Sequence, residues 1–208
     1  MSRYSLATLR DRFVADADRL AARLATARAA SDLVEEAAAA EYCIVALHDA
    51  YSRFVRDLLL RSSIGNAVTA GGSKLGAGSL GVVRLSDALN HLRSSWSSPK
   101  PGWWEPRWHL QRDATQVARL LDPPNRAVII GAIGASTNPN EQLRRVRNFV
   151  AHRGPSTSDG ADGVAVACGA VNWRQPRDII RIPIAGTGEV LFDQWCRQLK
   201  AVGRAAVV

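Results

Sequence analysis

The sequence predicts an all-α fold, a helical bundle with a long glycine-rich loop. The prediction also allows one short extended segment before the C-terminal helix. Apolar residues recur at spacings of three and four over most of the 208 residues, the period of amphipathic helices. Hydrophobic residues make up 47% of the chain and charged residues 22%, so a packed core is expected. Six glycines interrupt the helical period between Ser62 and Gly81. We therefore expect one helical domain over residues 1–208.

Two long helices are expected first. The segment from about Ser5 to Ser31 carries regularly spaced apolar residues, namely Leu6, Leu9, Phe13, Leu20 and Leu24. Ser31-Asp32 is typical of a helix start, because side-chain oxygens there accept hydrogen bonds from the first backbone N–H groups. Glu35 and Glu36 then stand in the favourable first turn. The second helix is expected to run to about Arg61 with one wide apolar stripe.

The glycine-rich segment from Ser62 to Gly81 is expected to be a mobile loop rather than a packed element. It contains GAGSLG at Gly76–Gly81, which has the spacing of a dinucleotide-binding fingerprint. That motif works only at the turn between a hydrophobic strand and a helix. No strand-like run precedes it here, so we expect no nucleotide cofactor at this loop.

A further helix is expected from Arg84 to Trp96, followed by the stretch SSPKPGWWEPRWHL, which holds three of the six tryptophans. Tryptophan beside proline is typical of a hydrophobic plug over the end of a bundle, and we favour that interpretation. Lys100 and Arg107 lie beside the rings, so a platform on which nucleic-acid bases stack is the alternative.

The C-terminal half is expected to hold three short helices, at Arg112–Leu121, Asn125–Ile133 and Pro139–His152. Gly154-Pro155 is expected to end the last of them and to open a loop to Gly163. Residues 168–185 have no helical period, and residues 179–182 suit a short strand or an extended wrap. An amphipathic helix from Glu189 to Ala206 closes the chain.

The chain is basic. Lys and Arg number 27 against 19 Asp and Glu, which gives a formal charge of +8, and 24 of the 27 cations are arginine. Arginine grips phosphate oxygens with a planar fork of donors, so this excess favours a polyanionic partner. A GC-rich coding sequence raises arginine content as well, so the total alone leaves both explanations open.

Several classes of protein are disfavoured. The longest uncharged apolar run, residues 127–135, is far shorter than the ~20 residues that cross a bilayer. The N-terminal residues carry charges where a secretory signal is apolar, so we expect a cytoplasmic protein without a membrane partner. The three cysteines, Cys43, Cys168 and Cys196, form no CxxC pair and are expected to be small buried hydrophobes. We expect no metal and no cofactor.

The highest density of charge lies in EQLRRVRNFVAHRG, residues 141–154, where Arg144, Arg145, Arg147 and Arg153 accompany one glutamate. On a helix, one arc holds Leu143, Val146, Phe149 and Val150, which we expect to pack inward. The opposite arc holds Arg144, Arg145, Asn148 and His152. Arg147 falls at the border, where its guanidinium is expected to be half-buried.

This arrangement predicts chemistry on a phosphodiester. Asn148 and His152 are four residues apart on one helical face, so the amide can hydrogen bond to the ring and select its tautomer. We predict that His152 is the general acid and base, with Arg147 as the clamp on the phosphate and its transition state. Asn148 would orient His152. Arg144, Arg145 and Arg153 would contact the RNA backbone.

Arg147-Asn148-Phe149-Val150-Ala151-His152 has the form R-N-x-x-x-H at the end of a helix, and with it the chain resembles the HEPN superfamily of α-helical ribonucleases. The tail AHRG is similar to the A-H-G ending of many members. ALHDAYSRFVRDLLL and PNRAVIIGAIG are similar to the RiboL-PSP type, so the resemblance covers about residues 34–154, the expected core. Residues 155–208 would add a loop, the irregular segment and the closing helix.

The resemblance implies a homodimer in which two motifs meet across a two-fold axis. It also implies a metal-independent endoribonuclease that leaves a 2′,3′-cyclic phosphate and a 5′-hydroxyl. A toxin or antiviral-defence setting is implied too, with an antitoxin or defence-system protein as a partner. In the segment ALHDAYSRF, Ser52 stands where relatives of this type are expected to carry an acidic residue, between Asp49 and Asp57.

Two alternatives remain from the sequence. The chain can be a catalytically silent module with the same fold that binds RNA or a protein. Arg147 and His152 can also simply cap and solubilise a helix. His48, on an otherwise apolar helix, is expected to be a core or rim residue.

Overall fold

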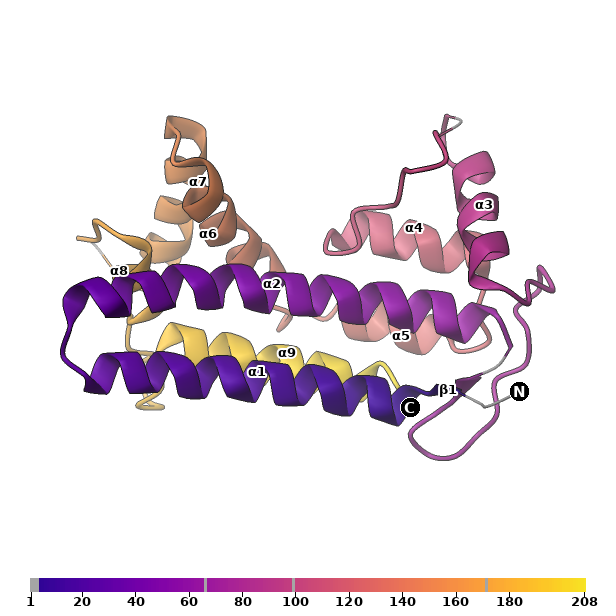
Figure 1. The fold of residues 1–208 in the computed structure, drawn as a ribbon, viewed down its shortest axis with the longest axis horizontal. Coiled ribbons are helices and arrows are strands. Elements are labelled where there is room, and N and C mark those ends of the chain that lie inside the picture. Colours follow the sequence, from indigo (N-terminus) through magenta and orange to yellow (C-terminus); the bar gives the residue numbers. More distant parts are fainter. Residues whose placement is uncertain (1–3, 66, 99, 171) are drawn as a thin grey trace. The chain divides into compact units, whose positions relative to one another are not determined.

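The computed structural model describes residues 4–65, 67–98, 100–170 and 172–208. Residues 1–3 lie outside it, as do Asn66 of the expected glycine-rich loop, Pro99 of the tryptophan-rich stretch and Val171 of the irregular segment. The described part is mostly helical, as predicted, with one two-stranded sheet (Figure 1). Its elements in chain order are β1 (Tyr4–Ser5), α1 (Leu6–Ala29), α2 (Leu33–Ser63), β2 (Ala67–Val68), α3 (Leu85–Ser95), α4 (Gln111–Leu121), α5 (Arg126–Ile133), α6 (Asn140–His152), α7 (Pro155–Ala167), α8 (Pro176–Ile180) and α9 (Leu191–Ala205).

The chain divides into two compact units, each assembled from segments that are far apart in sequence. Unit 1 comprises Met1–Val14, Tyr51–Ser136 and Ala201–Val208. Unit 2 comprises Ala15–Ala50 and Thr137–Lys200. The expected residues of catalysis therefore all belong to unit 2, together with the first part of α2. No helix of the described residues is both long and apolar enough to span a membrane.

Aromatic packing forms the core of unit 1. The ring of Phe13 stacks on that of Phe54, with centroids 4.9 Å apart and an interplanar angle of 23°, and Tyr51 lies 6.1 Å from Phe13. A Cβ at Gly203 would lie 3.2 Å from Phe13 Cδ1, so this part of α9 approaches the ring closely. Helices α3, α4 and α5 pack in succession within the same unit.

The glycine-rich segment differs from the expectation of a mobile loop. Its residues Ala67–Val68 form β2, which pairs in parallel with β1 in the register Tyr4↔Ala67. Two antiparallel bridges, Ile64↔Ala77 and Val68↔Lys74, fold the segment back on itself. Gly65 makes this possible, because a Cβ there would lie 2.5 Å from the backbone nitrogen of Ala77. Glycine therefore serves a close backbone approach here, which composition alone does not distinguish from flexibility.

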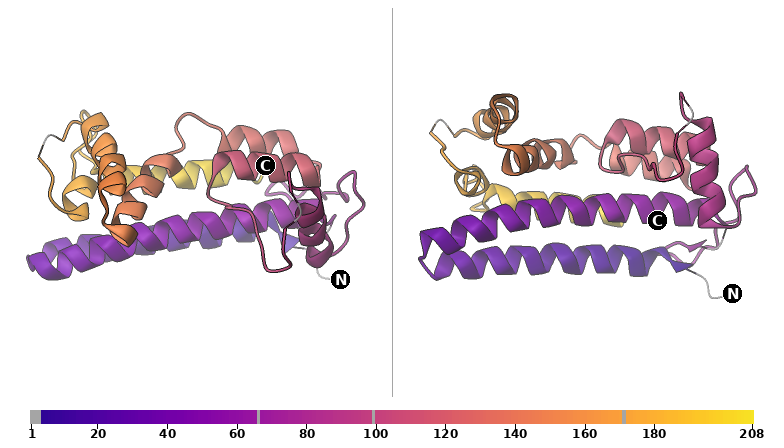
Figure 2. Two further views of the ribbon diagram at one scale, coloured as in Figure 1. Left: turned by 90° about the horizontal axis from the view of Figure 1, so that it is seen from above. Right: turned by 45° about the horizontal axis from the view of Figure 1, so that its top comes forward.

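In unit 2, the second part of α1 and the first part of α2 form an antiparallel hairpin (Figures 1 and 2). The predicted start of α2 is confirmed, since Asp32 Oδ1 accepts hydrogen bonds from the backbone N–H groups of Val34 and Glu35 at 2.8 and 3.2 Å. Across the hairpin, the guanidinium of Arg23 lies 4.3 Å from the ring centroid of Tyr42. These contacts fix the part of α2 that faces the C-terminal helices of the unit.

A buried acid ties α1, α2 and the end of α8 together. Glu36 is only 3% exposed, and its Oε1 lies 3.2 Å from Arg181 Nε and 3.8 Å from Arg28 Nε. A buried carboxylate is stable only when such partners offset its lost hydration. This cluster therefore holds residues that are 153 positions apart, from Arg28 to Arg181, in one arrangement.

The expectation of a loop after Gly154 was wrong. Residues 155–167 form α7, with Pro155 at the first helical position, where its missing N–H costs nothing. The backbone N–H of Gly154 donates to Thr157 Oγ1 at 2.9 Å, and that hydroxyl donates to the carbonyl of Gly154 at 2.8 Å. Helix α7 packs against α6 and buries Ala161, Val164 and Ala165. Gly154-Pro155 thus ends one helix and begins another.

The segment before the last helix also differs from expectation. Residues 176–180 form the short helix α8, whose start is capped by Asp178 Oδ2, the acceptor for the backbone N–H groups of Arg174 and Gln175 at 2.9 Å. Extended structure among the described residues of this segment is limited to a single bridge, Pro183↔Val190, just before α9. Residues 179–182 therefore do not form a strand, because Ile179 and Ile180 become the buried end of a helical turn.

Candidate functional site at the end of α6

Helix α6 is held in unit 2 by its apolar face. Leu143 and Val146 are fully buried, as expected, while Phe149 and Val150 are half-buried. The ring of Phe149 meets Trp173 edge-on at 5.2 Å. These contacts leave the opposite face of α6 at the surface, which is the face that carries the predicted functional side chains.

Two indole N–H groups anchor the surroundings of α6. Trp173 Nε1 donates to Asp162 of α7 at 2.5 Å, and Trp195 Nε1 of α9 donates to Gln142 of α6 at 3.0 Å. Trp195 is fully buried, so the one polar atom of its side chain is satisfied by α6 itself. The helix is thus fixed against both α7 and α9.

The R-N-x-x-x-H motif occupies the last two turns of α6. His152 is exposed in the final turn, and Asn148 is half-buried one turn earlier. Arg147 is half-buried, as its position at the border of the two arcs predicts, and its Nε is buried without a hydrogen-bond partner among the described residues. Within this part of the chain no hydrogen bond joins Asn148 to His152, so the orienting role of Asn148 stays a prediction.

Carboxylates hold the other three arginines of the motif region. Arg144 forms a two-pronged contact with Glu141 at 2.8 and 2.7 Å, and Arg145 Nε donates to the same carboxylate at 3.0 Å. The hydrogen bonds from Arg144, with those from Arg145, keep the pKa of Glu141 below its usual range. Arg153 forms an ion pair with Glu41 of α2. The patch therefore carries less net charge than its four arginines suggest.

His48 of α2 belongs to the same region of unit 2. It is 4% exposed, its Nδ1 lies 3.4 Å from Asp49 Oδ1, and the positive charges of Arg147 and Arg144 act on it. Burial lowers the pKa of His48, the hydrogen bond with Asp49 opposes this, and the two arginines lower the pKa further. The predicted core or rim position of His48 is confirmed, but no sequence pattern connected it with α6. The one feature of the sequence that singles out His48 is its position next to Asp49 on an otherwise apolar helix.

The cysteines do not supply a nucleophile. Cys43 and Cys196 are buried as expected, and Cys168 is half-buried. Burial raises the pKa of Cys43 to about 11 and that of Cys196 to about 12, and it raises the pKa of Cys168 as well. Thiols in such surroundings stay protonated at neutral pH and are poor nucleophiles. Among the described residues, no group of three or more His, Cys, Asp or Glu is placed to hold a metal ion.

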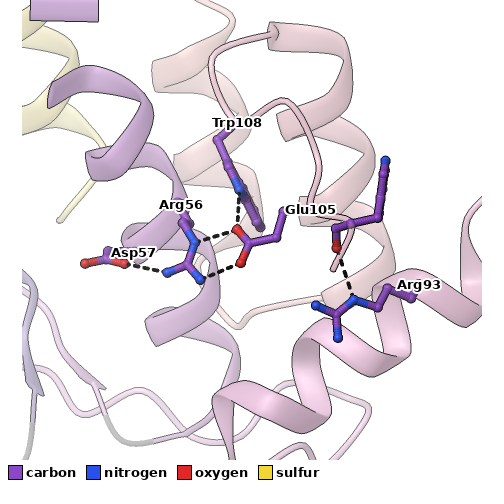
Figure 3. Close-up of polar contacts among 6 residues, drawn as sticks. Arg56, Asp57, Arg93, Glu105 and Trp108 are labelled. Atoms are coloured by element: carbon purple, nitrogen blue, oxygen red, sulfur yellow. Dashed lines mark hydrogen bonds and ion pairs between the residues drawn. The ribbon is translucent and has the colours of Figure 1, made fainter. Parts of the chain in front are cut away.

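The tryptophan-rich stretch, in unit 1, supports the hydrophobic-plug interpretation for Trp108. Trp108 is 6% exposed, and its Nε1 donates to Glu105 at 2.9 Å (Figure 3). Glu105 also accepts two hydrogen bonds from Arg56 of α2, at 2.7 and 2.8 Å. Arg93 Nε donates to the carbonyl of Trp104 at 3.0 Å. Trp103 differs, because it is 82% exposed.

The last two turns of α6 thus carry an exposed histidine, a half-buried arginine and a half-buried amide. Arg144, Arg145 and Arg153 surround these groups but are paired with acids. Comparisons of the chain with protein-family models, with curated proteins and with solved structures find no match.

The lowered pKa of His48 makes stability depend on pH. Below pH 6.5, the usual pKa of histidine, the unfolded chain binds a proton at His48, whereas the folded protein resists it. The free energy of unfolding should therefore fall as the pH drops from about 7 to about 5. His48→Gln should flatten this slope, measured by urea denaturation at several pH values. Val34→Gln places a glutamine at an exposed residue of the same helix without removing a titrating group, so it is the control. Equal slopes for wild type and His48→Gln would contradict the expectation.

Proposed function

We propose that this protein is a metal-independent endoribonuclease with a HEPN-like fold, in which the end of α6 is the active site. The observation that carries the proposal is the placement of the R-N-x-x-x-H motif. Its histidine is exposed in the last turn of α6, and its arginine is half-buried at the edge of the core with an Nε donor that has no partner among the described residues. A guanidinium and an accessible imidazole within two turns of one helix supply the two kinds of group that phosphodiester cleavage without a metal requires.

The reaction proceeds by internal transfer. His152 takes the proton of the ribose 2′-hydroxyl, and the 2′-oxygen attacks the adjacent phosphorus. The bond from phosphorus to the 5′-oxygen breaks, and that oxygen takes the proton that His152 had removed, so His152 acts first as general base and then as general acid. The products are a 2′,3′-cyclic phosphate and a 5′-hydroxyl. Arg147 stabilises the negative charge that builds on the phosphorane oxygens, and Asn148 orients the ring of His152.

The paired arginines take part in substrate binding. Arg144, Arg145 and Arg153 are half-buried or exposed, and their acidic partners Glu141 and Glu41 are also near the surface. Exposed ion pairs of this kind contribute little to stability, so a phosphate can exchange for a carboxylate at small cost. These arginines then contact the RNA backbone on either side of the motif. We place the activity in the cytoplasm, in a toxin or antiviral-defence setting with a partner protein that restrains it.

The first test is cleavage of RNA in EDTA. Wild-type protein should cleave, and His152→Ala should reduce the rate by at least ~10²-fold, because general acid–base catalysis typically contributes that much. His91→Ala removes a histidine from α3 in unit 1 and is the matched control. Cleavage by His152→Ala at the wild-type rate would exclude this mechanism. RNA binding without cleavage by wild type would instead favour the silent binding module.

The second test asks whether Arg144 and Arg145 of α6 bind RNA once their carboxylate partner is removed. Glu141→Gln removes the carboxylate that holds Arg144 and Arg145, so both become available to phosphate. We expect tighter RNA binding and a steeper salt dependence, by about 0.7 in the log–log slope for each additional phosphate that the protein binds on a single strand. Binding is measured by fluorescence anisotropy from low to moderate salt.

The control for this second test is Glu35→Gln, which makes the same change of charge at an exposed residue of α2 that has no arginine partner among the described residues. An equal effect of both variants would mean that only net charge matters, and that Arg144 and Arg145 do not contact RNA.

A second copy of the chain completes the site in this proposal. His152 is exposed at the end of α6, so the motif of a second subunit can meet it across a two-fold axis. Light scattering should therefore give a mass of about twice 22.5 kDa at the concentrations that support cleavage. A monomer that cleaves RNA at full rate would show that one motif is sufficient and would remove the dimer from the proposal.

A further inference from the structure

The exposed side of α4, in unit 1, contains an open cavity of about 460 Å³. It is open to solvent along the helix, so it suits an extended ligand that lies on the surface rather than an enclosed small molecule. Five side chains line it, all from this one helix: Gln111, Arg112, Thr115, Gln116 and Arg119. Every one of them can donate a hydrogen bond, and none carries a negative charge. The cavity is therefore suited to an anionic ligand that also offers polar edges.

The cavity residues are exposed or half-buried because the other side of α4 forms core. Val117 and Leu121 are buried there together with Ala114 and Ala118. Arg112 and Arg119 are seven residues apart, which is about 10.5 Å along a helix at ~1.5 Å per residue. Thr115 and Gln116 lie between them. The cavity thus has a guanidinium at each end and uncharged polar groups in the middle.

A buried acid lies beside two arginines at the start of α4. Asp113 is 4% exposed; its Oδ2 accepts a hydrogen bond from Arg107 Nε at 3.0 Å, and its Oδ1 lies 3.5 Å from Arg112 Nε. Both contacts use Nε, and the side chains of Arg107 and Arg112 are 60% and 81% exposed. The terminal nitrogens of both arginines have no hydrogen-bond partner in the part of the chain that the structure describes. These nitrogens are available as planar forks of donors for phosphate oxygens.

At the other end of the cavity, the positive charge of Arg119 is likewise not balanced by a nearby acid of the described chain. Arg119 has no ion pair among the described residues. Asp122, the acid just beyond α4, is paired with Arg126 at 2.5 Å. The single carboxylate of Asp113 therefore balances only one of three positive charges, those of Arg107, Arg112 and Arg119. This leaves a net positive charge of about two along the helix.

We propose that this face of α4 binds a single strand of RNA. Arg112 and Arg119 contact phosphates about three nucleotides apart, since a stacked strand rises ~3.4 Å per nucleotide and the two side chains start about 10.5 Å apart. Gln116 and Thr115 hydrogen bond to base edges or ribose hydroxyls between them. Base edges are accessible to amides in single strands but are hidden in the deep groove of an RNA duplex.

This inference rests on the proposed function for the identity of the ligand as RNA, and it adds a binding surface in unit 1 to the cleavage motif in unit 2. A surface separate from the motif would let the protein hold a strand whether or not the scissile bond is at His152. Removal of that surface should then weaken binding without changing the chemistry of the cleavage step.

The experiment measures binding of a fluorescein-labelled single-stranded RNA of about 12 nucleotides in EDTA, at several salt concentrations. Every protein is full length and carries His152→Ala, so the RNA stays intact. Arg112→Ala with Arg119→Ala should weaken binding by about tenfold or more and reduce the log–log salt slope by about 1.4, or ~0.7 for each of two contacts. Arg112→Lys with Arg119→Lys should keep the slope but weaken binding, because lysine lacks the fork.

Two further variants distinguish binding by these particular α4 side chains from attraction by the net positive charge of the protein. Arg12→Ala with Arg204→Ala removes the same charge from exposed residues of unit 1 that make no ion pair among the described residues. Gln116→Ala should weaken binding with no change of slope. Unchanged binding by the α4 double variant, or an equal loss in the Arg12 and Arg204 control, would overturn the proposal. So would equal binding of the same RNA as a duplex. Circular dichroism confirms that each variant is folded.

The two proposals fail separately. If the protein with intact His152 cleaves RNA and the α4 double variant binds as tightly as its parent, the proposed endoribonuclease activity is supported and the proposed α4 binding surface is wrong. If no cleavage is seen but binding depends on Arg112 and Arg119, the α4 binding surface is supported and the endoribonuclease activity is wrong.

Discussion

The turn at Arg153-Gly154-Pro155 governs the arrangement of the candidate active site. Arg153 adopts a left-handed conformation with φ of 38°, which ends α6, and Pro155 then begins α7 within two residues. That conformation costs a non-glycine residue about 1–2 kcal/mol, so the surrounding contacts must favour it. They do so in two ways: α7 packs on α6, and the side chain of Arg153 pairs with Glu41. The abrupt end of α6 is what leaves His152 at the surface.

Electrostatics around that end are set by acids as much as by arginines. Glu141 holds two of the four arginines and Glu41 holds a third, whereas Arg147 keeps a buried Nε without a partner among the described residues. The pKa of buried His48 is lowered because desolvation, with the charges of Arg147 and Arg144, outweighs the opposing hydrogen bond with Asp49. The charge of +8 is therefore a poor guide to where a polyanion binds. Guanidinium nitrogens without acid partners are a better one. Among the described residues these include the guanidinium of Arg119 and the terminal nitrogens of Arg112, whose Nε alone lies near Asp113.

In this interpretation the two units have different roles, cleavage in one and RNA binding in the other. Unit 2 carries the histidine and arginine for the chemistry, and unit 1 carries a polar cavity on α4 with room for a strand. In each unit a buried carboxylate has arginine partners: Glu36 lies near Arg28 and Arg181 in unit 2, and Asp113 lies near Arg107 and Arg112 in unit 1. Such partners offset the lost hydration of a buried acid, and the hydrogen bond from Arg107 to Asp113 sets the direction of that guanidinium.

Local sequence determined most of the helices and the location of the R-N-x-x-x-H motif, because helical periodicity and caps such as Asp32 act within a few residues. Only the tertiary structure decided the rest. Residues 155–167, rich in Ser, Gly and Asp, have little helical preference of their own and become α7 by packing on α6. Ala67–Val68 becomes a strand only because β1 lies beside it. The pairing of Arg153 with Glu41, 112 residues away, and the effect of the Arg147 charge on His48 depend on how α2 and α6 are arranged in unit 2. Interactions between distant segments leave no periodic signal, so the chain alone does not reveal which arginines are paired.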